Sequence, residues 1–388
     1  MATYKEQNKL NVPHLRFSEF HGEWEKCKLG DIAEFSTARI SSVKLDCKNY
    51  VSTENMLQDF QGVVEAKSVP NETNVISFTC GDILISNIRP YLKKVWKATF
   101  DGGCSSDVFV LQATDTVAKD YLHYAVANDK FINYVMSGAK GVKMPRGDKN
   151  QMRTYQLSLP SIQEQYKIAK LLTLLDERIA TQSKLIEDLK KLKSAIIEIE
   201  YTPNTKTTSP IGDVIEQISK RNKNNAIQNV LSVSNRQGFI KQSDQFENRN
   251  VASEDTSNYK IVEQNDFVFN PARINVGSIA RLTTFEKGIV SPMYVCFRTQ
   301  ENVAPEYIDY FFESKHFYCE IQKRLEGSVR QCLSFEGLCN IPLSLPSFEI
   351  QQRIGKRIFT LEQKIKMETD LLELLNKQKQ YLLRQMFI

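Results

Sequence analysis

Two long stretches of the chain carry apolar residues at alternating steps of four and three positions. The first series is Ile168, Leu172, Leu175, Ile179, Ile186, Leu189 and Ile196, and the second is Ile354, Ile358, Leu361, Ile365, Leu372, Leu375 and Leu382. Polar residues interrupt both series at the same steps, Gln182 and Lys193 in the first and Glu368 and Lys379 in the second. An alternation held over about four heptads predicts a coiled-coil seam, because 3.5 residues per turn keep one stripe facing a partner.

Two arrangements of these long helices are compatible with the pattern. Each helix could pack separately on its own domain, as amphipathic helices commonly do. A helix of about 39 residues is roughly 58 Å long at 1.5 Å per residue, however, and this exceeds what a small domain can cover. We therefore favour pairing of the two helices, antiparallel if the halves are related by a pseudo-twofold axis. The polar interruptions would then select one register at some cost in stability.

The segments outside the helices repeat one another. LGDIAEFSTAR from Leu29 returns as IGDVIEQISKR from Ile211, and GDILISNIRP from Gly81 faces NDFVFNPAR from Asn265. SLPS occurs once before each long helix. The shift between the copies grows only from 182 to 186 residues along the chain, which small loop insertions explain. The chain is therefore a tandem duplication.

Each copy combines short strand-like runs with a helical segment. DILIS and VFVLQA in the first copy, and DFVFN and MYVCF in the second, have the composition of strands. A helical stretch follows near Asp120 or Glu306, and then a short strand ends at Pro160 or Pro346, where a helix can begin. The pattern predicts a mixed α/β fold for each copy.

The repeats and the seams divide the chain into five parts. We assign residues 1–161 and 211–347 to two similar globular domains, and residues 162–201 and 348–388 to the long helices. Residues 202–210 are rich in Thr and Pro and have no apolar period, so we expect them to link the halves.

Composition places the chain among ordinary globular proteins. Its 388 residues, 41% hydrophobic and 25% charged, suffice for two or three domains. No run approaches the ~18 to 20 apolar residues of a membrane helix, and the start is too polar for a signal peptide, so we expect a cytoplasmic protein. The eight cysteines include no C-x-x-C pair, which favours reduced thiols over a disulfide framework or a zinc site.

Residue patterns that support catalysis are scarce. The chain has no Gly-rich phosphate loop, dinucleotide fingerprint or G-x-S-x-G elbow, and its four histidines lack metal-binding spacing. An amino-methyltransferase would carry an Asn/Asp-Pro-Pro-aromatic motif, but Asn270-Pro271 continues as Ala272-Arg273. We therefore predict no catalytic residue, no metal site and no cofactor site in this chain.

Positive charge gathers at equivalent places in the two copies. The net charge of +5 is too small to indicate a nucleic-acid partner by itself. The candidate DNA-binding residues of the first copy are Arg89, Tyr91, Lys93, Lys94, Lys140, Lys143, Arg146 and Lys149, and those of the second are Arg273, Asn275, Arg281 and Arg330. Clustered charge is often only a solvated surface. Recurrence in both copies favours contact with DNA, where cations meet phosphates and other side chains read bases.

These residues resemble a known family. The opening PHLRFSEFHGEWEKCKLGDI, the segments GDILISNIRPYLKK and NDFVFNPARINVGSIA, and the twice-used SLPS before a long helix are similar to the specificity subunit of type I restriction-modification systems. The likeness covers almost the whole chain. It implies that each domain is a target-recognition domain reading one half of a split DNA sequence. It also implies that the two helices form an antiparallel coiled coil that sets the gap.

The resemblance further implies partner subunits and no catalysis by this chain. In that family two methylation subunits, which bind S-adenosylmethionine and methylate adenine, dock on the specificity subunit, and an ATP-driven restriction subunit joins to cut DNA. S-adenosylmethionine, ATP and Mg are thus expected on partners, double-stranded DNA is expected as a ligand, and no membrane is involved. The second copy lacks an equivalent of the Trp24 segment before Ile211, so the two ends need not contact the methylation subunits identically.

Two other classes of function stay open at this point. A stand-alone nuclease or transferase with an unrecognised site would be active as the purified chain. A coiled-coil adaptor that never touches DNA would lack salt-dependent DNA binding, because that dependence comes from phosphate contacts.

Overall fold

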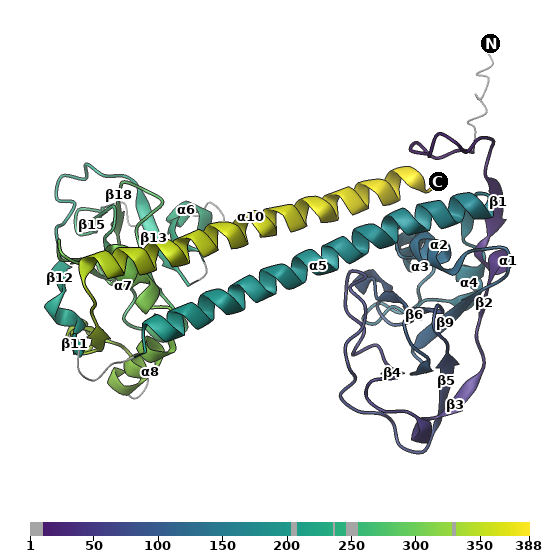
Figure 1. Ribbon diagram of the computed structural model, residues 1–388, viewed down its shortest axis with the longest axis horizontal. Coiled ribbons are helices and arrows are strands. Elements are labelled where there is room, and N and C mark those ends of the chain that lie inside the picture. Colours follow the sequence, from purple (N-terminus) through teal and green to yellow (C-terminus); the bar gives the residue numbers. More distant parts are fainter. Residues whose placement is uncertain (1–10, 203–207, 236, 246–254, 328–330) are drawn as a thin grey trace, which may run out of the picture. The chain divides into compact units, whose positions relative to one another are not determined.

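The computed structural model describes residues 11–202, 208–235, 237–245, 255–327 and 331–388. The chain folds into two compact units, which we call unit 1 (Met1–Ser183 with Leu371–Ile388) and unit 2 (Lys184–Asp370). The long helices α5 (Ile162–Glu200) and α10 (Phe348–Met386) each contribute one part to either unit (Figure 1).

Unit 1 is built on two four-stranded sheets. The first is antiparallel, with the strand order β2 (Ala33–Phe35), β9 (Val108–Ala113), β6 (Ile83–Ser86) and β7 (Val95–Lys97). The second has the order β3 (Arg39–Ser41), β5 (Asn74–Phe78), β8 (Gly102–Cys104) and β4 (Tyr50–Val51), where only β4 and β8 are parallel. A separate antiparallel pair joins β1 (Glu25–Lys28) to β10 (Gln156–Leu159).

Short helices complete unit 1. They are α1 (Leu29–Ile32), α2 (Lys119–Val126), α3 (Asp129–Ser137) and α4 (Lys149–Arg153), with 3-10 turns η1 (Ser42–Lys44) and η2 (Pro90–Leu92). Asn128 caps α3 by accepting a hydrogen bond from Phe131 N, and Asp148 caps α4 by accepting from Asn150 N. These side chains satisfy amide groups that a helix start leaves without partners, so the sequence fixes both starts locally.

The central strands of unit 1 are buried on both faces. On β6, Ile83 and Ile85 pack into a core with Tyr121 of α2, and Leu84 points to the other side, against Trp96 and the second sheet. Alternate residues of a strand face opposite ways, so this apolar run of β-branched and Leu residues is covered by helices on one face and by the second sheet on the other.

Unit 2 repeats the design. One sheet has the order β12 (Ile215–Ile218), β19 (Val295–Thr299), β16 (Phe267–Phe269) and β17 (Ile279–Arg281), and the other has the order β14 (Gly238–Lys241), β13 (Val230–Ser234), β18 (Lys287–Val290) and β15 (Lys260–Glu263). β11 (Thr208–Pro210) pairs with β20 (Pro342–Ser344). The helical elements are η3 (Ile211–Asp213), α6 (Gln242–Gln245), η4 (Ile274–Val276), α7 (Pro305–Phe311), α8 (Lys315–Arg324) and α9 (Phe335–Cys339).

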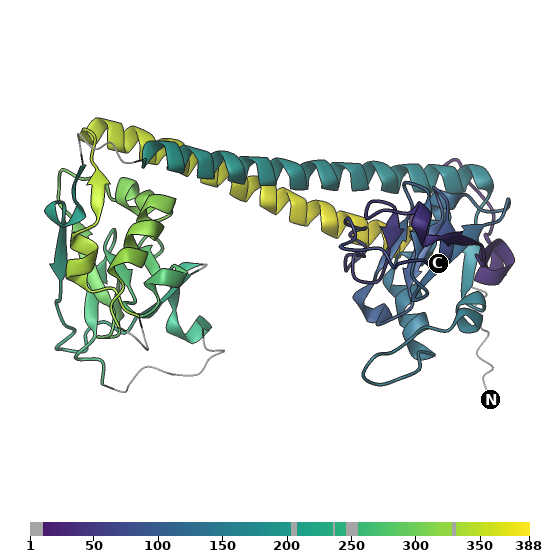
Figure 2. The same ribbon diagram turned by 90° about the horizontal axis from the view of Figure 1, so that it is seen from below.

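The long helices pair within each unit. In unit 1, Ile168 and Leu172 near the start of α5 share a core with Met386 near the end of α10. In unit 2, Ile196 near the end of α5 shares a core with Ile358 near the start of α10 (Figure 1 and Figure 2). The helices are therefore antiparallel in both units. All fourteen predicted seam residues are buried or half-buried, and the alternative of helices packed separately on their own domains is excluded.

The predicted duplication and mixed α/β fold are confirmed, with two local differences. The expected strand MYVCF begins two residues later, because β19 starts at Val295. Thr208–Pro210, which the sequence pattern placed in the linker, forms β11, since its partner β20 offers a free edge just before α10. The rest of that linker, 203–207, lies outside the described residues.

Candidate nucleic-acid interface

A hairpin in unit 1 brings together the two basic segments selected from the sequence. Lys140 and Arg146 exchange both backbone hydrogen bonds, with N to O distances of 3.0 and 2.9 Å, and so close the tip 141–145. The backbone N–H of Arg89, in the loop after β6, donates to Pro145 O at 2.8 Å. The hairpin is thus anchored to the loop that carries Arg89.

Four cations on this hairpin and loop are exposed. They are Arg89, Lys140, Lys143 and Arg146. Arg146 lies 3.4 Å from Asp107 and Lys140 lies 3.6 Å from Asp148, but the cationic side chains keep 54% and 84% of their surface exposed. Pairs this exposed contribute little to stability, so these cations can exchange their partners for phosphates. Tyr91 of η2 is also exposed, at 48%.

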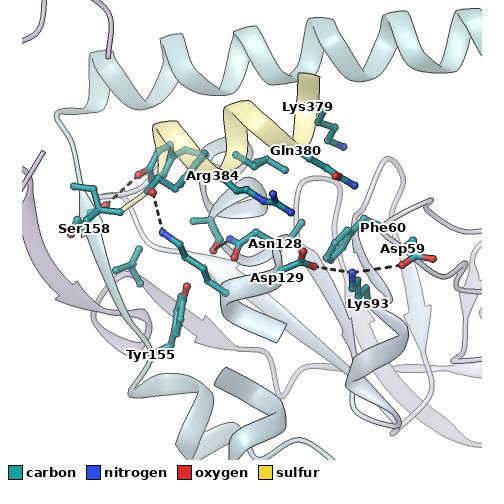
Figure 3. A pocket seen from close by; sticks show the side chains of 18 of the residues that line it. Asp59, Phe60, Lys93, Asn128, Asp129, Tyr155, Ser158, Lys379, Gln380 and Arg384 are labelled. Carbon is teal, nitrogen blue, oxygen red and sulfur yellow. Dashed lines mark hydrogen bonds and ion pairs between the residues drawn. The ribbon is translucent and has the colours of Figure 1, made fainter. Parts of the chain in front are cut away.

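Lys93 belongs to a different environment. Its Nζ lies 2.9 Å from Asp129 at the start of α3 and 4.0 Å from Asp59, on the wall of a cavity of about 240 Å³ beside α10 (Figure 3). Tyr155 and Phe60 are among the aromatic residues that line the same cavity. Lys93 thus ties two acidic loops together inside unit 1 and does not join the exposed cations.

Lys94 and Lys149 are likewise occupied within unit 1. The Nζ of Lys94 donates to Thr53 O at 2.6 Å, and burial lowers the pKa of its ammonium group. The Nζ of Lys149 lies 4.7 Å from the centre of the Phe109 ring, and burial again lowers its pKa, with nearby Arg153 acting in the same direction. The carbonyl oxygen of Thr53 compensates the partial burial of the Lys94 ammonium group, and the face of the Phe109 ring does so for Lys149.

Unit 2 repeats the hairpin and its anchor. Glu326 and Cys332 exchange both backbone hydrogen bonds at 2.9 Å, and Leu333 N donates to Pro271 O at 3.0 Å. In unit 1 the equivalent bond runs from Gly147 N to Asn87 O, also at 3.0 Å. One of the two bonds that hold the hairpin is therefore the same in both units, whereas Arg273 N donates to Asn270 O and not to the hairpin as Arg89 N does.

The candidate residues of unit 2 fall into three groups. Arg273 is exposed and precedes η4 as Arg89 precedes η2, while Asn275 within η4 is half-buried. Arg330 lies outside the described residues. Arg281, at the end of β17, is almost buried.

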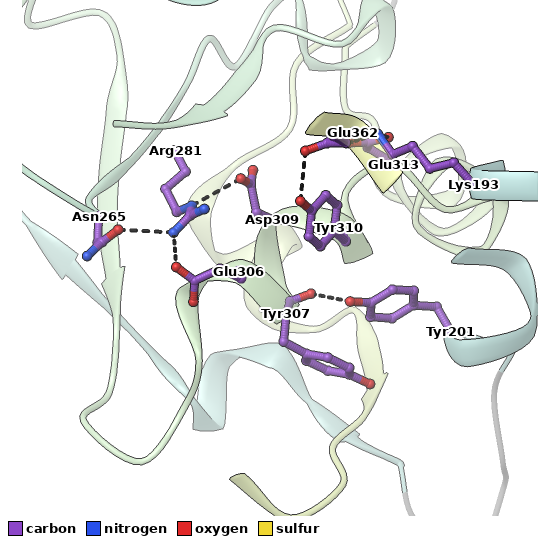
Figure 4. Close-up of polar contacts among 10 residues, drawn as sticks. All are labelled: Lys193, Tyr201, Asn265, Arg281, Glu306, Tyr307, Asp309, Tyr310, Glu313 and Glu362. Atoms are coloured by element: carbon purple, nitrogen blue, oxygen red, sulfur yellow. Dashed lines mark hydrogen bonds and ion pairs between the residues drawn. The ribbon is translucent and has the colours of Figure 1, made fainter. Parts of the chain in front are cut away.

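Arg281 is held by a polar network inside unit 2. Its Nε donates to Asp309 Oδ2 at 3.0 Å, and its Nη1 donates to Glu306 at 2.5 Å and to Asn265 at 3.0 Å (Figure 4). Only 9% of the Arg281 side chain is exposed. Burial raises the pKa of Asp309 to about 6, and Arg281 counteracts that rise. The geometry indicates a strand-to-helix link, in contrast to the DNA contact predicted from the sequence.

The duplication itself contained the signal for this link. Lys97 ends β7 as Arg281 ends β17, and Lys97 is paired with Asp120 of α2, the counterpart of Glu306. A cation and an acid had therefore been retained together in both copies, which is typical of an internal ion pair. Asp309 corresponds to the half-buried His123, whose pKa is lowered by desolvation to about 4, so its ring is uncharged at neutral pH.

A third group of cations was missed by the sequence reasoning. Lys220, Arg221, Lys223 and Lys287 surround an open depression of about 820 Å³ in unit 2. The signal in the sequence is the run Lys-Arg-Asn-Lys at residues 220–223, which is a recognisable basic segment. Arg221 donates to Asn258 Oδ1 at 3.0 Å, and Lys287 lies 2.9 Å from Glu263.

The helices also expose apolar side chains away from the seam. In unit 2, Leu185, Leu192 and Ile199 follow one another at heptad spacing on α5 and are 40%, 49% and 74% exposed. Large apolar side chains at regular spacing on an accessible helix face are typical of an interaction surface. In unit 1, Leu374 and Tyr381 of α10 are exposed in the same way.

Within the described ranges, no group of three or more His, Cys, Asp or Glu side chains is arranged to hold a metal ion. None of the helices in that part of the chain combines the length and the apolar character that a membrane crossing requires.

Taken together, two equivalent α/β units, each with an anchored hairpin, and a pair of antiparallel helices define a duplicated scaffold of the DNA-specificity class. The model of the type I restriction modification DNA specificity domain matches residues 21–191 and again residues 203–377. The chain belongs to this family. Its role is that of a non-catalytic DNA-specificity subunit.

One curated relative and two solved structures are similar to nearly the whole chain. The type I restriction enzyme MjaVIII specificity subunit of Methanocaldococcus jannaschii is 24% identical over 98% of this chain and 95% of its own length. The crystal structure of a type I restriction-modification S subunit from M. genitalium superposes with a TM-score of 0.62 at 15% identity, over 97% of this chain and 99% of the other. A chain from a structure describing complex assembly and conformational transition of the type I R-M system gives 0.54 at 16% identity, over 93% and 96%.

Proposed function

We propose that this chain selects a bipartite duplex-DNA target, with each α/β unit reading one half-site and the helix pair setting the gap between them. The observation that supports this most directly is a backbone anchor that occurs in both units. Gly147 N donates to the loop two residues before the exposed Arg89, and Leu333 N donates to the loop two residues before the exposed Arg273. Equivalent scaffolds with different side chains suit two readers of different sequences.

The exposed cations supply the affinity in this proposal. Arg89, Lys140, Lys143 and Arg146 are placed on one loop and one hairpin, where they can contact successive phosphates. Each phosphate contact releases counterions and steepens the fall of affinity with salt. Neighbouring side chains such as Tyr91 would then read base edges.

Partner subunits complete the activity. We propose that two methylation subunits and a restriction subunit assemble on this chain, and that S-adenosylmethionine, ATP and Mg bind to those subunits. The exposed apolar residues of α5 and α10 are suitable docking positions, because a methylation subunit could bury them with a helix of its own. Methylation of a base within a duplex requires base flipping into the partner's active site, so this chain positions and bends the DNA.

The proposal is tested by mapping methylated adenines in DNA from cells that carry the chain with its partner subunits. We expect a single bipartite motif with a fixed gap. Replacing residues 211–347 by the equivalent segment of a divergent relative should change one half of the motif and leave the other unchanged. A change in both halves would contradict the two-reader arrangement, and DNA binding without salt dependence would contradict phosphate contact.

A further inference from the structure

A hydroxyl, a carboxylate and an ammonium group from three elements meet at one point of unit 1. Tyr124 of α2 donates its hydroxyl hydrogen to Asp176 Oδ2 at 2.8 Å, and Lys379 Nζ lies 2.6 Å from Oδ1 of the same carboxylate. The ammonium group is also 6.0 Å from the centre of the Tyr124 ring. Since Asp176 is on α5 and Lys379 on α10, one carboxylate connects the α/β domain to both long helices.

Unit 2 contains the same triad with the roles of the helices exchanged. Tyr310 of α7 donates to Glu362 Oε2 at 2.8 Å, and Lys193 Nζ lies 2.6 Å from Oε1 (Figure 4). The carboxylate is now on α10 and the cation on α5. Glu313 provides a second carboxylate 2.7 Å from Lys193. Burial alone would lower the pKa of Lys193, but Glu313 and Glu362 outweigh it and raise that pKa.

The two triads are counterparts in the duplication. Each member lies 186 residues from its equivalent: Tyr124 and Tyr310, Asp176 and Glu362, Lys193 and Lys379. Both lysines occupy positions that interrupt the apolar seam, and only 16% and 23% of their side chains are exposed. Retention of the whole set in both copies indicates a shared task.

Apolar contacts alone define the register of such a helix pair poorly. If one helix slid along the other by a heptad, Leu and Ile would again face Leu and Ile, and the helix would have moved about 10.5 Å. The same slide would separate each seam lysine from its carboxylate by that distance and leave largely buried charges unpaired, which is strongly unfavourable. The triads therefore distinguish one register from its neighbours.

We propose that the two Tyr-carboxylate-Lys triads are register locks, which fix the axial position of α5 against α10 and the seating of each domain on the helices. Through this positioning they determine which gap between DNA half-sites the complex accepts. The inference rests on the proposed function and adds the residues that enforce its spacing.

The test removes the ion pair of each triad, and with Lys193 also its pair with the half-exposed Glu313, from the full-length chain while keeping the seam apolar. The variant carries Asp176→Leu with Lys379→Met and Glu362→Leu with Lys193→Met. Apolar replacement of a buried ion pair commonly preserves or increases stability, so this variant is expected to fold. Together with the methylation subunits it is given a library of duplexes in which the mapped half-sites are separated by different gaps. We expect methylation at other gaps, relative to the wild-type gap, to rise about tenfold or more.

A matched control keeps the triads and removes neighbouring ion pairs. Lys191→Met with Lys377→Met breaks two exposed pairs, each formed with a glutamate on the same helix. This control should retain the wild-type gap. A second test variant, Tyr124→Phe with Tyr310→Phe, removes only the two hydroxyls. We expect it to methylate other gaps to a smaller extent than the apolar variant does. If the apolar variant does not fold, this Phe variant tests the register locks in its place.

The outcomes separate the inference from the function on which it rests. A folded apolar variant, or failing that the Phe variant, that methylates only the wild-type gap overturns the register locks. Equal relaxation in the control variant overturns them as well. A wild-type complex without any bipartite target refutes the proposed function itself, whereas a wild-type complex with one fixed gap upholds it regardless of how the variants behave.

Discussion

Replacing Arg281 by Met tests whether this residue holds unit 2 together or binds DNA. The change removes three hydrogen bonds, two of them to carboxylates, from a guanidinium group that is only 9% exposed. Removing one partner of a buried ion pair costs about 3–5 kcal/mol. Because Glu306 and Asp309 keep 42% and 31% of their side-chain surface, we expect the lower end, about 3 kcal/mol. For a unit of this size, that corresponds to a fall in Tm of roughly 6–12 °C.

The expected loss depends on pH in a definite direction. The folded-state pKa of Asp309 lies above its unfolded value, so its ionisation destabilises the fold as the pH rises through that pKa. Arg281 opposes this effect, and its removal raises the pKa of Asp309 further. The difference in unfolding free energy between wild type and Arg281→Met should therefore be largest near pH 8 and shrink as the pH falls toward 5, where Asp309 is protonated in the variant.

The assay is urea unfolding of the full chain followed by circular dichroism, with Lys97→Met as the matched control. Lys97 makes the equivalent strand-to-helix pair in unit 1, but its side chain and that of Asp120 are 29% and 49% exposed, so its loss should cost at most about 1 kcal/mol. The reasoning would be refuted if both variants lost the same stability. It would also be refuted if Arg281→Met kept wild-type stability and lost DNA affinity.

Three further predictions concern the DNA surface, the partner surface and the helix end. Replacing both Lys143 and Arg146 by Ala should reduce the slope of log affinity against log salt by about 1.8, measured by fluorescence anisotropy, and an unchanged slope would remove the hairpin from the interface. Leu192→Asp should abolish co-purification of the methylation subunits without altering salt-dependent DNA binding; retained co-purification would exclude this position from docking. Tyr201→Phe removes a hydroxyl that donates to Tyr307 O at 2.6 Å, and a loss of about 1–2 kcal/mol is expected in urea unfolding, with no loss arguing against that bond.

Much of the fold could be predicted because its signals are local or repeated. The seam is periodic, so residues such as Leu172 and Ile358 could be placed at the helix interface from their spacing alone. Equivalent segments of the two copies predict the same strands, so the duplication supports each strand assignment twice. The position of β19 was two residues off because MYVCF contains no breaker before Val295, and boundaries of short strands depend on partners that lie far away in sequence.

The candidate site could be predicted only in outline. Sequence identified the two basic segments, and the hairpin shows that they meet through the bond between Arg89 N and Pro145 O. The sequence alone does not distinguish an exposed cation from one that has a partner inside the domain. Lys94, Lys149 and Lys143 are equally positive in the sequence. In the fold, however, Lys94 donates to a carbonyl oxygen and Lys149 lies over an aromatic ring, and tertiary structure brings these partners together. The triads were visible only as interruptions of the seam.

The link from β17 to α7 bears on how new variants of this protein can arise by recombination. Arg281 faces two carboxylates of α7, Glu306 and Asp309, whereas Lys97 faces one carboxylate of α2, Asp120. Each set is thus charge-matched and spans a strand and a helix that lies later in the chain. A crossover that falls between the strand and the helix would combine the cation of one parent with the helix of another and leave a buried charge unmatched. Viable hybrid genes should therefore have their breakpoints outside residues 282–305, and new specificities should be inherited as intact blocks.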